Sequence, residues 1–408
     1  MKIYKFLLIL IIALLVFGCI GTNNINDKIN NRQNKTNFTS QVNATELVNP
    51  DKLKERPISE ILECQKENSK REQERCYDNF IKDKMNFKTT KELLQEMDEA
   101  ANNNDNLRLS CHDFAHAIGR NTYRKFNNSI PAAFSQCVQT CHAGCYHGAI
   151  QSFFLGDNYQ QQSDDHVTLV QMREKVKLAC KPLEGNVKEL FQCLHGMGHA
   201  ILYYVDNNLT LALSICDELK TDYQRQSCYG GEFMENVVSV NKETRQIKLD
   251  SPLYPCNSLE EKYKYQCYLM QTSVMMEIFG DNTDKMVESC DKADNGYIET
   301  CFKSLGRDRS NHFRIKNDLP FQDIKKIDKK YKMDYVSGLI YALLDNTWNG
   351  YYAFPFCSKL DDKDLKDNCY RTAINYLSLN LDTSKEDIKK SCEEHTPSED
   401  KNYCLERV

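Results

Sequence analysis

The chain has 408 residues and a formal net charge of −5, from 53 basic and 58 acidic residues. A balance this mild, without a basic patch, argues against nucleic acid as a partner. Its nineteen cysteines favour a disulfide-bonded protein of an oxidising compartment.

The first 18 residues predict a secretory signal. A basic start, Met1 to Lys5, is followed by an apolar run from Phe6 to Phe17, which is too short to span a bilayer comfortably. The ending Val16-Phe17-Gly18-Cys19 resembles the lipobox of prokaryotic lipoproteins, and the resemblance implies that Cys19 becomes the first mature residue and carries a lipid. An ordinary signal peptide and an uncleaved anchor are the alternatives. In each case we expect export, with the chain held at the outer face of the cell membrane.

Residues 19–50 are rich in asparagine and threonine and poor in large apolar side chains. Such a composition cannot bury enough surface to fold, so we expect a flexible tether. Three glycosylation sequons lie in it, at Asn34, Asn37 and Asn43, and they suggest a glycosylated cell surface.

Cysteine spacing defines the region 51–408. Seven local pairs have members eleven to thirteen positions apart, and we expect each to form a disulfide: Cys64–Cys76, Cys180–Cys193, Cys216–Cys228, Cys256–Cys267, Cys290–Cys301, Cys357–Cys369 and Cys392–Cys404. The second members, together with Cys111 and Cys145, recur with a period near 34 residues, and Tyr335 to Leu339 occupies the one position without a cysteine. A period of this length is typical of a solenoid.

Each unit reads as two helices joined by a charged turn. The first helix ends near the first cysteine, as in Leu211 to Cys216, and the second passes through the second cysteine, as in Cys369 to Leu377. Alternating strand patterns are absent from the sequence. We therefore predict an all-α solenoid of about ten helical hairpins, most of them stapled by a disulfide within the repeat. Closing a loop of this size contributes roughly 3 kcal/mol in the entropy model.

The side chain three positions after the second cysteine is small in most units, at Gly148, Gly196, Gly231, Ser304, Gly338 and Thr372. Glycine inside a helix costs roughly 1 kcal/mol relative to alanine, so its recurrence indicates close approach between helices. Unit length and small residues together resemble tetratricopeptide and Sel1-like repeats. The Cys-x-His-Gly pattern is similar to that of cysteine-rich exported proteins of archaea and other microbes that have no assigned function. These resemblances imply an architecture and no particular activity.

Four cysteines remain, at positions 111, 137, 141 and 145, and three connectivities are open to them. The segment Pro131 to Cys137 ends as other first helices do, which favours Cys137–Cys145 and leaves Cys111–Cys141. A haem attachment at Cys137 to His142 is an alternative, but three residues separate its cysteines where the c-type motif has two. The chain contains no Cys-x-x-Cys, which argues against zinc-ribbon and thioredoxin-like motifs.

Histidines gather in units two to four. Six of the nine lie there, namely His112, His116, His142, His147, His195 and His199, with His166 in the same stretch. The two i, i+4 pairs each share a helix face. Because second helices of a solenoid lie side by side, we expect His147 and His195 in one row, with His116 and His199 close to it.

Two accounts of this cluster are open. In the first, His112, His116, His147, His195 and His199 bind a transition metal such as zinc. An open coordination position could then support hydrolysis, with Asp113, Glu232 or Glu235 as the base. In the second, the histidines form a structural polar row that hydrogen-bonds to backbone across a tight helix interface.

The leading functional expectation follows from the architecture. Solenoids present long concave faces, so we expect a lipid-anchored binding or scaffold module for a protein, peptide or glycan near the membrane. The alternative is a metal-binding or metal-dependent hydrolytic protein that uses the histidine cluster.

Overall fold

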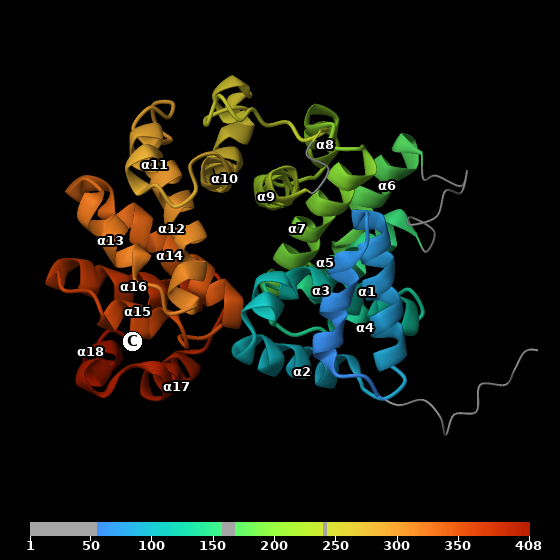
Figure 1. Ribbon diagram of the computed structural model, residues 1–408, viewed down its shortest axis with the longest axis horizontal. Coiled ribbons are helices and arrows are strands. Elements are labelled where there is room, and N and C mark those ends of the chain that lie inside the picture. Colours follow the sequence, from blue (N-terminus) through green and yellow to red (C-terminus); the bar gives the residue numbers. More distant parts are fainter. Residues whose placement is uncertain (1–54, 157–167, 240–242) are drawn as a thin grey trace, which may run out of the picture. The chain divides into compact units, whose positions relative to one another are not determined.

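The computed structural model describes residues 55–156, 168–239 and 243–408 (Figure 1). These residues belong to one compact unit, Lys54–Val408. The expected signal peptide, Cys19, the tether with its sequons and His166 lie outside the described ranges.

The described residues form α-helices and short 3-10 helices, with no β-strand among them. They make ten hairpins, which confirms the predicted fold class. In chain order the pairs are η2 (Ile58–Lys66) and α1 (Lys70–Lys84), α2 (Thr90–Asn103) and α3 (Asp105–Lys125), α4 (Ile130–Phe134) and α5 (Gly144–Leu155), α6 (Leu169–Ala179) and α7 (Val187–Tyr204), α8 (Leu209–Cys216) and α9 (Asp222–Val238), η4 (Cys256–Ser258) and α10 (Glu261–Phe279), α11 (Thr283–Cys290) and α12 (Ile298–Arg314), α13 (Leu319–Lys326) and α14 (Lys332–Thr347), α15 (Ala353–Ser358) and α16 (Lys363–Leu379), and α17 (Lys385–His395) and α18 (Lys401–Leu405). Further 3-10 turns are η3 (Lys181–Leu183), η5 (Lys329–Tyr331) and η6 (Ser398–Asp400).

The unit at Tyr335, which has no cysteine pair, keeps the same form as α13 and α14. In the described part of the chain, no helix is long and apolar enough to cross a bilayer.

Polar caps define where several helices begin. At the start of α9, the Thr221 hydroxyl accepts from the backbone N–H of Gln224, whose side chain accepts from the backbone of Thr221. This capping box satisfies two N–H groups that a helix end otherwise leaves without a partner. The same device starts α2 at Thr89 and α6 at Thr168.

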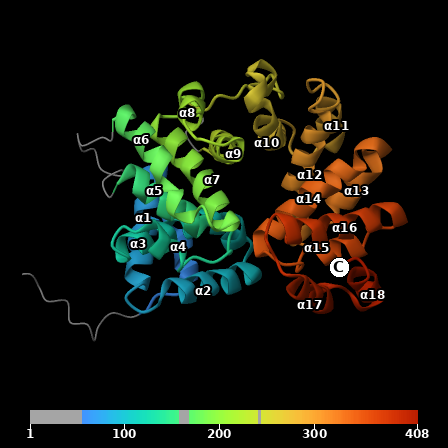
Figure 2. The same cartoon turned by 180° about the vertical axis from the view of Figure 1, so that it is seen from behind.

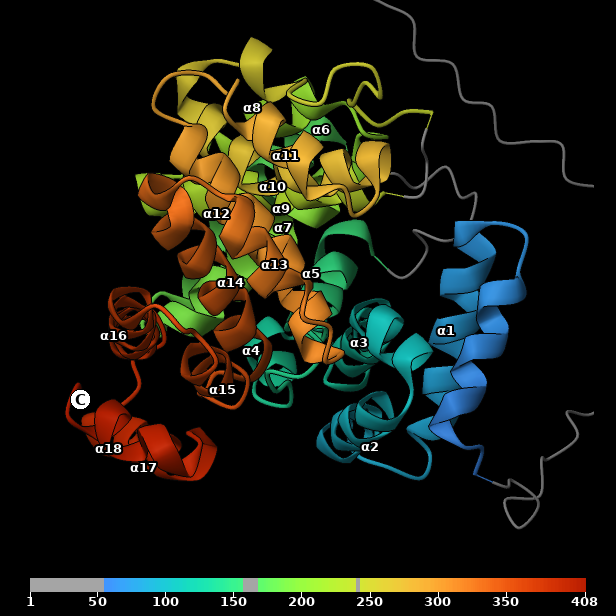
Figure 3. The same ribbon diagram turned by 60° about the vertical axis from the view of Figure 1, so that its left-hand side comes forward.

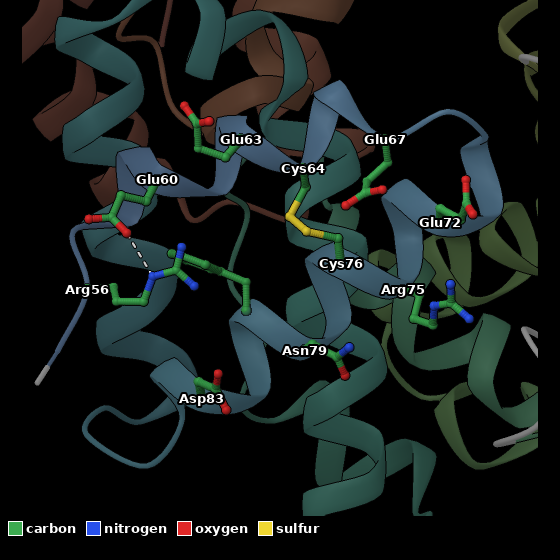
Figure 4. Close-up of a pocket in the computed structure, with 11 residues that line it drawn as sticks. Arg56, Glu60, Glu63, Cys64, Glu67, Glu72, Arg75, Cys76, Asn79 and Asp83 are labelled. Carbon is green, nitrogen blue, oxygen red and sulfur yellow. Dashed lines mark hydrogen bonds and ion pairs between the residues drawn. A yellow bond between two sulfur atoms is a disulfide. The ribbon is translucent and has the colours of Figure 1, made fainter. Parts of the chain in front are cut away.

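Disulfides join the two helices of a hairpin across its turn. All seven predicted pairs are present, and so is Cys137–Cys145. Figure 4 shows the first of these bonds, between Cys64 of η2 and Cys76 of α1. Because each bond lies within one repeat, it constrains the hairpin and leaves the packing between repeats to side chains.

The remaining two cysteines correct a prediction. Cys111 and Cys141 are buried free thiols, so the expected Cys111–Cys141 disulfide is wrong. The two thiols do meet, because a hydrogen bond joins them. Cys141 lies in a short loop already closed by the Cys137–Cys145 bond, and it interacts with Cys111 without a covalent bond. Burial, and then this hydrogen bond, raises the pKa of the Cys141 thiol well above its usual value.

The long second helices stack in chain order, and α3, α5, α7 and α9 are consecutive members of this stack (Figures 2 and 3). Glycine makes the closest crossings possible. A Cβ atom at Gly119 would overlap the Cys145 carbonyl oxygen, and one at Gly148 would overlap that of His116. Gly306 and Gly338 form the same reciprocal pair between α12 and α14. The small residue three positions after the second cysteine therefore allows neighbouring helices to approach closely, as the sequence predicts.

Repeat three also contacts repeats seven and eight. Arg314, at the end of α12, donates to His142 Nε2 at 2.9 Å. Trp348 caps α14 and stacks on Tyr146 of α5, with ring centroids 6.1 Å apart. These contacts fix the loop before α5, in which Cys141, His142 and Ala143 all have positive φ.

Candidate metal centre

Helices α3, α5 and α7 each contribute to the histidine cluster, and the glycine contacts explain why the rings meet. A Cβ atom at Gly144 would overlap the His112 carbonyl oxygen, and one at Gly148 would overlap the His116 carbonyl oxygen. A Cβ atom at Gly196 would lie against the Cα of His147. Small residues on one helix thus lie directly against histidines on the next. The repeat's packing device and the histidines share one interface, which the sequence alone does not reveal.

All five predicted histidines lie in one contiguous cluster. Ring centroids are 4.5 Å apart for His112 and His116, 5.6 Å for His116 and His147, 5.3 Å for His147 and His195, and 5.1 Å for His195 and His199. The predicted row along consecutive second helices is therefore formed.

Three of the five rings converge more closely than the others. One nitrogen from each of His112, His116 and His147 lies within 4.8 Å of the corresponding atoms of the other two. His195 and His199 flank this group of three, which we call the three-histidine centre.

Hydrogen bonds set the proton positions on His112 and His116. His112 Nδ1 lies 3.0 Å from the Cys141 carbonyl oxygen, and His116 Nδ1 lies 3.2 Å from Gln151 Oε1. Both oxygens only accept, so both Nδ1 atoms carry the proton. The Gln151 orientation is fixed because Arg120 also donates to Oε1. Each Nε2 then holds a lone pair, and the two Nε2 atoms face each other at 3.1 Å.

The other helices hold their imidazoles in the same manner. His147 Nε2 donates to Gln192 Oε1 at 3.0 Å, and His199 Nδ1 donates to Glu235 Oε2 at 2.9 Å. Among the described residues, the second ring nitrogens, His147 Nδ1 and His199 Nε2, are buried and have no hydrogen-bond partner. A ring oriented by an oxygen acceptor with its other nitrogen free is the usual state of a metal-ligating histidine.

Burial keeps the rings of His116, His147 and His199 neutral. It lowers the pKa of His116 and His147 well below the usual value, and the neighbouring imidazoles lower them further. The pKa of His199 falls to about 3, again through burial first and then the nearby His112. Neutral imidazole is the form that binds transition metals.

His195 and His142 point elsewhere. His195 stacks on Phe191 with centroids 5.5 Å apart, and its Nε2 lies 3.4 Å from the sulfur of Met234. His142 accepts from Arg314, so its Nε2 lone pair is already used. The sequence pattern places His195 in the row but does not show that its ring turns away from the three-histidine centre.

The three candidate bases have different surroundings. Asp113 is half-exposed and pairs with Lys70 at 3.2 Å. Glu235 orients His199, and burial raises its pKa to about 7. Glu232 is fully buried, with its Oε1 2.9 Å from the sulfur of Cys216. Burial, and then the nearby Asp217, raises its pKa well above the usual value.

Glu232 also lies with Cys216 and Cys228 in a group that has the spacing of metal ligands. Those sulfurs form a disulfide, so the thiolates that a metal would need are absent from this group. In the same way, the Cys137–Cys145 bond excludes the haem attachment considered at Cys137.

Two residues that position the site were missed from the sequence, Gln151 and Gln192. Gln151 lies four positions after His147, and Gln192 three positions before His195, so each shares a helix face with a histidine. A search for polar residues at this spacing around the histidines would have found both.

Two surface hollows of the described residues lie away from the histidines. The one shown in Figure 4 is formed by η2 and α1 and is lined by the acidic side chains Glu60, Glu63, Glu67, Glu72 and Asp83 beside Arg56 and Arg75. Another lies around Asp217 and Lys262. The histidine cluster is instead a packed interior site between helices.

No protein-family model, no curated protein and no solved structure matches this chain.

Proposed function

We propose that this protein binds a transition-metal ion through His112 Nε2, His116 Nε2 and His147 Nδ1. The observation that carries the proposal is the 3.1 Å separation of the two Nε2 atoms of His112 and His116, both of which hold lone pairs. Two lone pairs at this distance repel unless a proton or a cation lies between them. Neutral imidazole nitrogens that face each other in this way are suited to share a transition-metal cation.

The distances suit a first-row metal. With zinc–nitrogen bonds of about 2.0–2.1 Å, nitrogens 3.1 Å apart subtend an angle of about 100° at the metal, close to tetrahedral. Tetrahedral ligand nitrogens lie about 3.3 Å apart, and one nitrogen of each of the three rings already lies within 4.8 Å of those of the other two. Zinc is the first candidate because imidazole ligands suit it and because three protein ligands leave a fourth position for water.

Zinc affinity of the full chain tests the proposal by competition with a chromophoric chelator. We expect wild type to bind one zinc ion and H116A and H147A to bind at least 100-fold more weakly. Gln151→Leu, which removes the oxygen that orients His116, should weaken binding by about 10–100-fold. The control is H395A, a histidine on α17 that faces Glu394. Zinc binding that is absent from wild type, or unchanged in H116A, would contradict the proposal.

We also propose that the protein works outside the cytoplasm, with lipid on Cys19 as its anchor to the cell membrane. The eight disulfides support an oxidising compartment. Mass spectrometry of the mature N-terminus tests this, since lipid should be present on wild type and lost in C19S. Binding of a protein, peptide or glycan partner, and metal-dependent hydrolysis, stay predictions from the sequence.

A further inference from the structure

Beside the three-histidine centre, α7 and α9 bring a softer set of ligand atoms together. His195 Nε2 lies 3.4 Å from Met234 Sδ. One turn along α7, His199 has a buried Nε2 with no hydrogen-bond partner among the described residues. The rings of His195 and His199 are 5.1 Å apart. His195 and His199 are both more than nine-tenths buried.

The proton on His195 lies on the side away from the sulfur. The backbone of Ser227 hydrogen-bonds to the ring, and Nε2 faces Met234, so Nδ1 is the atom left to meet the Ser227 carbonyl. The Nδ1 atom does lie against the α9 backbone, 3.4 Å from where a Cβ at Gly230 would be. With the proton on Nδ1, a lone pair on Nε2 faces the lone pairs of a thioether. Neither atom then donates to the other.

The separation of these two atoms matches a shared cation. Metal–nitrogen bonds of about 2.0 Å and metal–sulfur bonds of about 2.3 Å place the two atoms 3.4 Å apart when the angle at the metal is about 105°. Glu235 holds the proton on His199 Nδ1, so His199 also offers a lone pair from Nε2. Thioether ligands select Cu(I) over harder ions.

We propose that His195 Nε2, Met234 Sδ and His199 Nε2 form a second metal site, specific for Cu(I). The site adjoins the three-histidine centre, since the His147 ring lies 5.3 Å from that of His195 and 5.4 Å from that of His199. It uses none of the ligands of that centre. The second site goes beyond the proposed function, and an experiment can contradict either site without contradicting the other. The copper is bound as Cu(I) and released as Cu(I), so no electron transfer is involved.

Cu(I) binding to the full chain tests the second site, with the bicinchoninate complex of Cu(I) as donor under anaerobic conditions. The background is C111S/C141S, because free thiols bind Cu(I) and would mask a thioether. We expect one Cu(I) per chain and a sulfur neighbour at about 2.3 Å by X-ray absorption. Met234→Leu should weaken binding at least tenfold and remove the sulfur signal.

Three comparisons make the outcome decisive. Met333→Leu, a partly buried methionine on α14, is the matched control and should bind as the background does. Leucine in place of methionine conserves volume, and the circular dichroism of M234L should confirm an unchanged fold. H116A should lose zinc but keep Cu(I), which separates failure of one site from failure of the other. Cu(I) affinity unchanged in M234L, or no sulfur neighbour in the background, would overturn the second site.

Discussion

Individual imidazole rings are set by their hydrogen-bond partners rather than by the helices that carry them. The partners come from four different sources: the Cys141 carbonyl, two glutamine amides and the Glu235 carboxylate. In a purely structural polar row, both nitrogens of each ring would find partners. Here His147 Nδ1 and His199 Nε2 have none among the described residues, although leaving a buried polar atom unsatisfied costs roughly 1–3 kcal/mol. This cost favours the metal account over the structural one.

A carboxylate outside the histidine cluster gives the fold a pH dependence. Burial raises the pKa of Asp345 on α14 to about 6, although the Tyr376 hydroxyl donates to its Oδ1 at 2.6 Å and lowers it in part. The native state therefore holds more protons than the unfolded chain between about pH 4 and pH 6. The stability contributed by this group is fully present below about pH 4 and is lost as the pH rises through 6.

Asp345→Asn tests this sign. Asparagine stays neutral, so the free energy of unfolding of wild type should fall relative to D345N by roughly 2 kcal/mol between pH 4 and pH 7, after allowance for solvent screening. Urea denaturation at several pH values measures the difference. Asp361→Asn, at an exposed position, should show no such trend. A constant difference between wild type and D345N would contradict the assignment.

Between helices, reciprocal glycine contacts set how closely neighbouring repeats pack. Gly306 of α12 lies against the Tyr335 carbonyl, and Gly338 of α14 lies against the Lys303 carbonyl. A carbonyl belongs to the rigid helix backbone and cannot move aside as a flexible side chain can. The same arrangement at Gly148 and Gly231 supports the His116 and His195 backbones, so helix spacing and site geometry have one cause.

Gly338→Ala should therefore destabilise the protein, although alanine is the better helix former by roughly 1 kcal/mol. The added methyl overlaps the Lys303 carbonyl, and we expect a loss of about 1–3 kcal/mol or more from overpacking. Gly185→Ala is the matched control, because a Cβ there meets nothing within 4 Å. Thermal unfolding compares the two variants. Equal midpoints would show that the α12–α14 crossing can relax at no cost.

Over the whole molecule, the sequence predicts those features that depend on spacing along the chain. The period near 34 residues predicts ten hairpins, and short cysteine separations predict eight disulfides, because both are local properties of one repeat. Prediction from the sequence fails for contacts whose geometry depends on two repeats at once. Cys111 and Cys141 belong to different repeats, and helix periodicity cannot tell a thiol contact from a bond. Likewise, helix periodicity places His195 in the row, but it does not predict the direction of the ring. The ring stacks on Phe191 and faces Met234.

The central claim concerns three nitrogens and one metal ion, and X-ray absorption at the zinc edge tests it most directly. The sample is the full chain loaded with one equivalent of zinc. We predict three imidazole ligands with zinc–nitrogen distances of about 2.0–2.1 Å, one further light ligand and no sulfur, with one imidazole lost in H147A. A sulfur ligand, fewer than three imidazoles, or a spectrum unchanged in H147A would contradict the three-histidine centre.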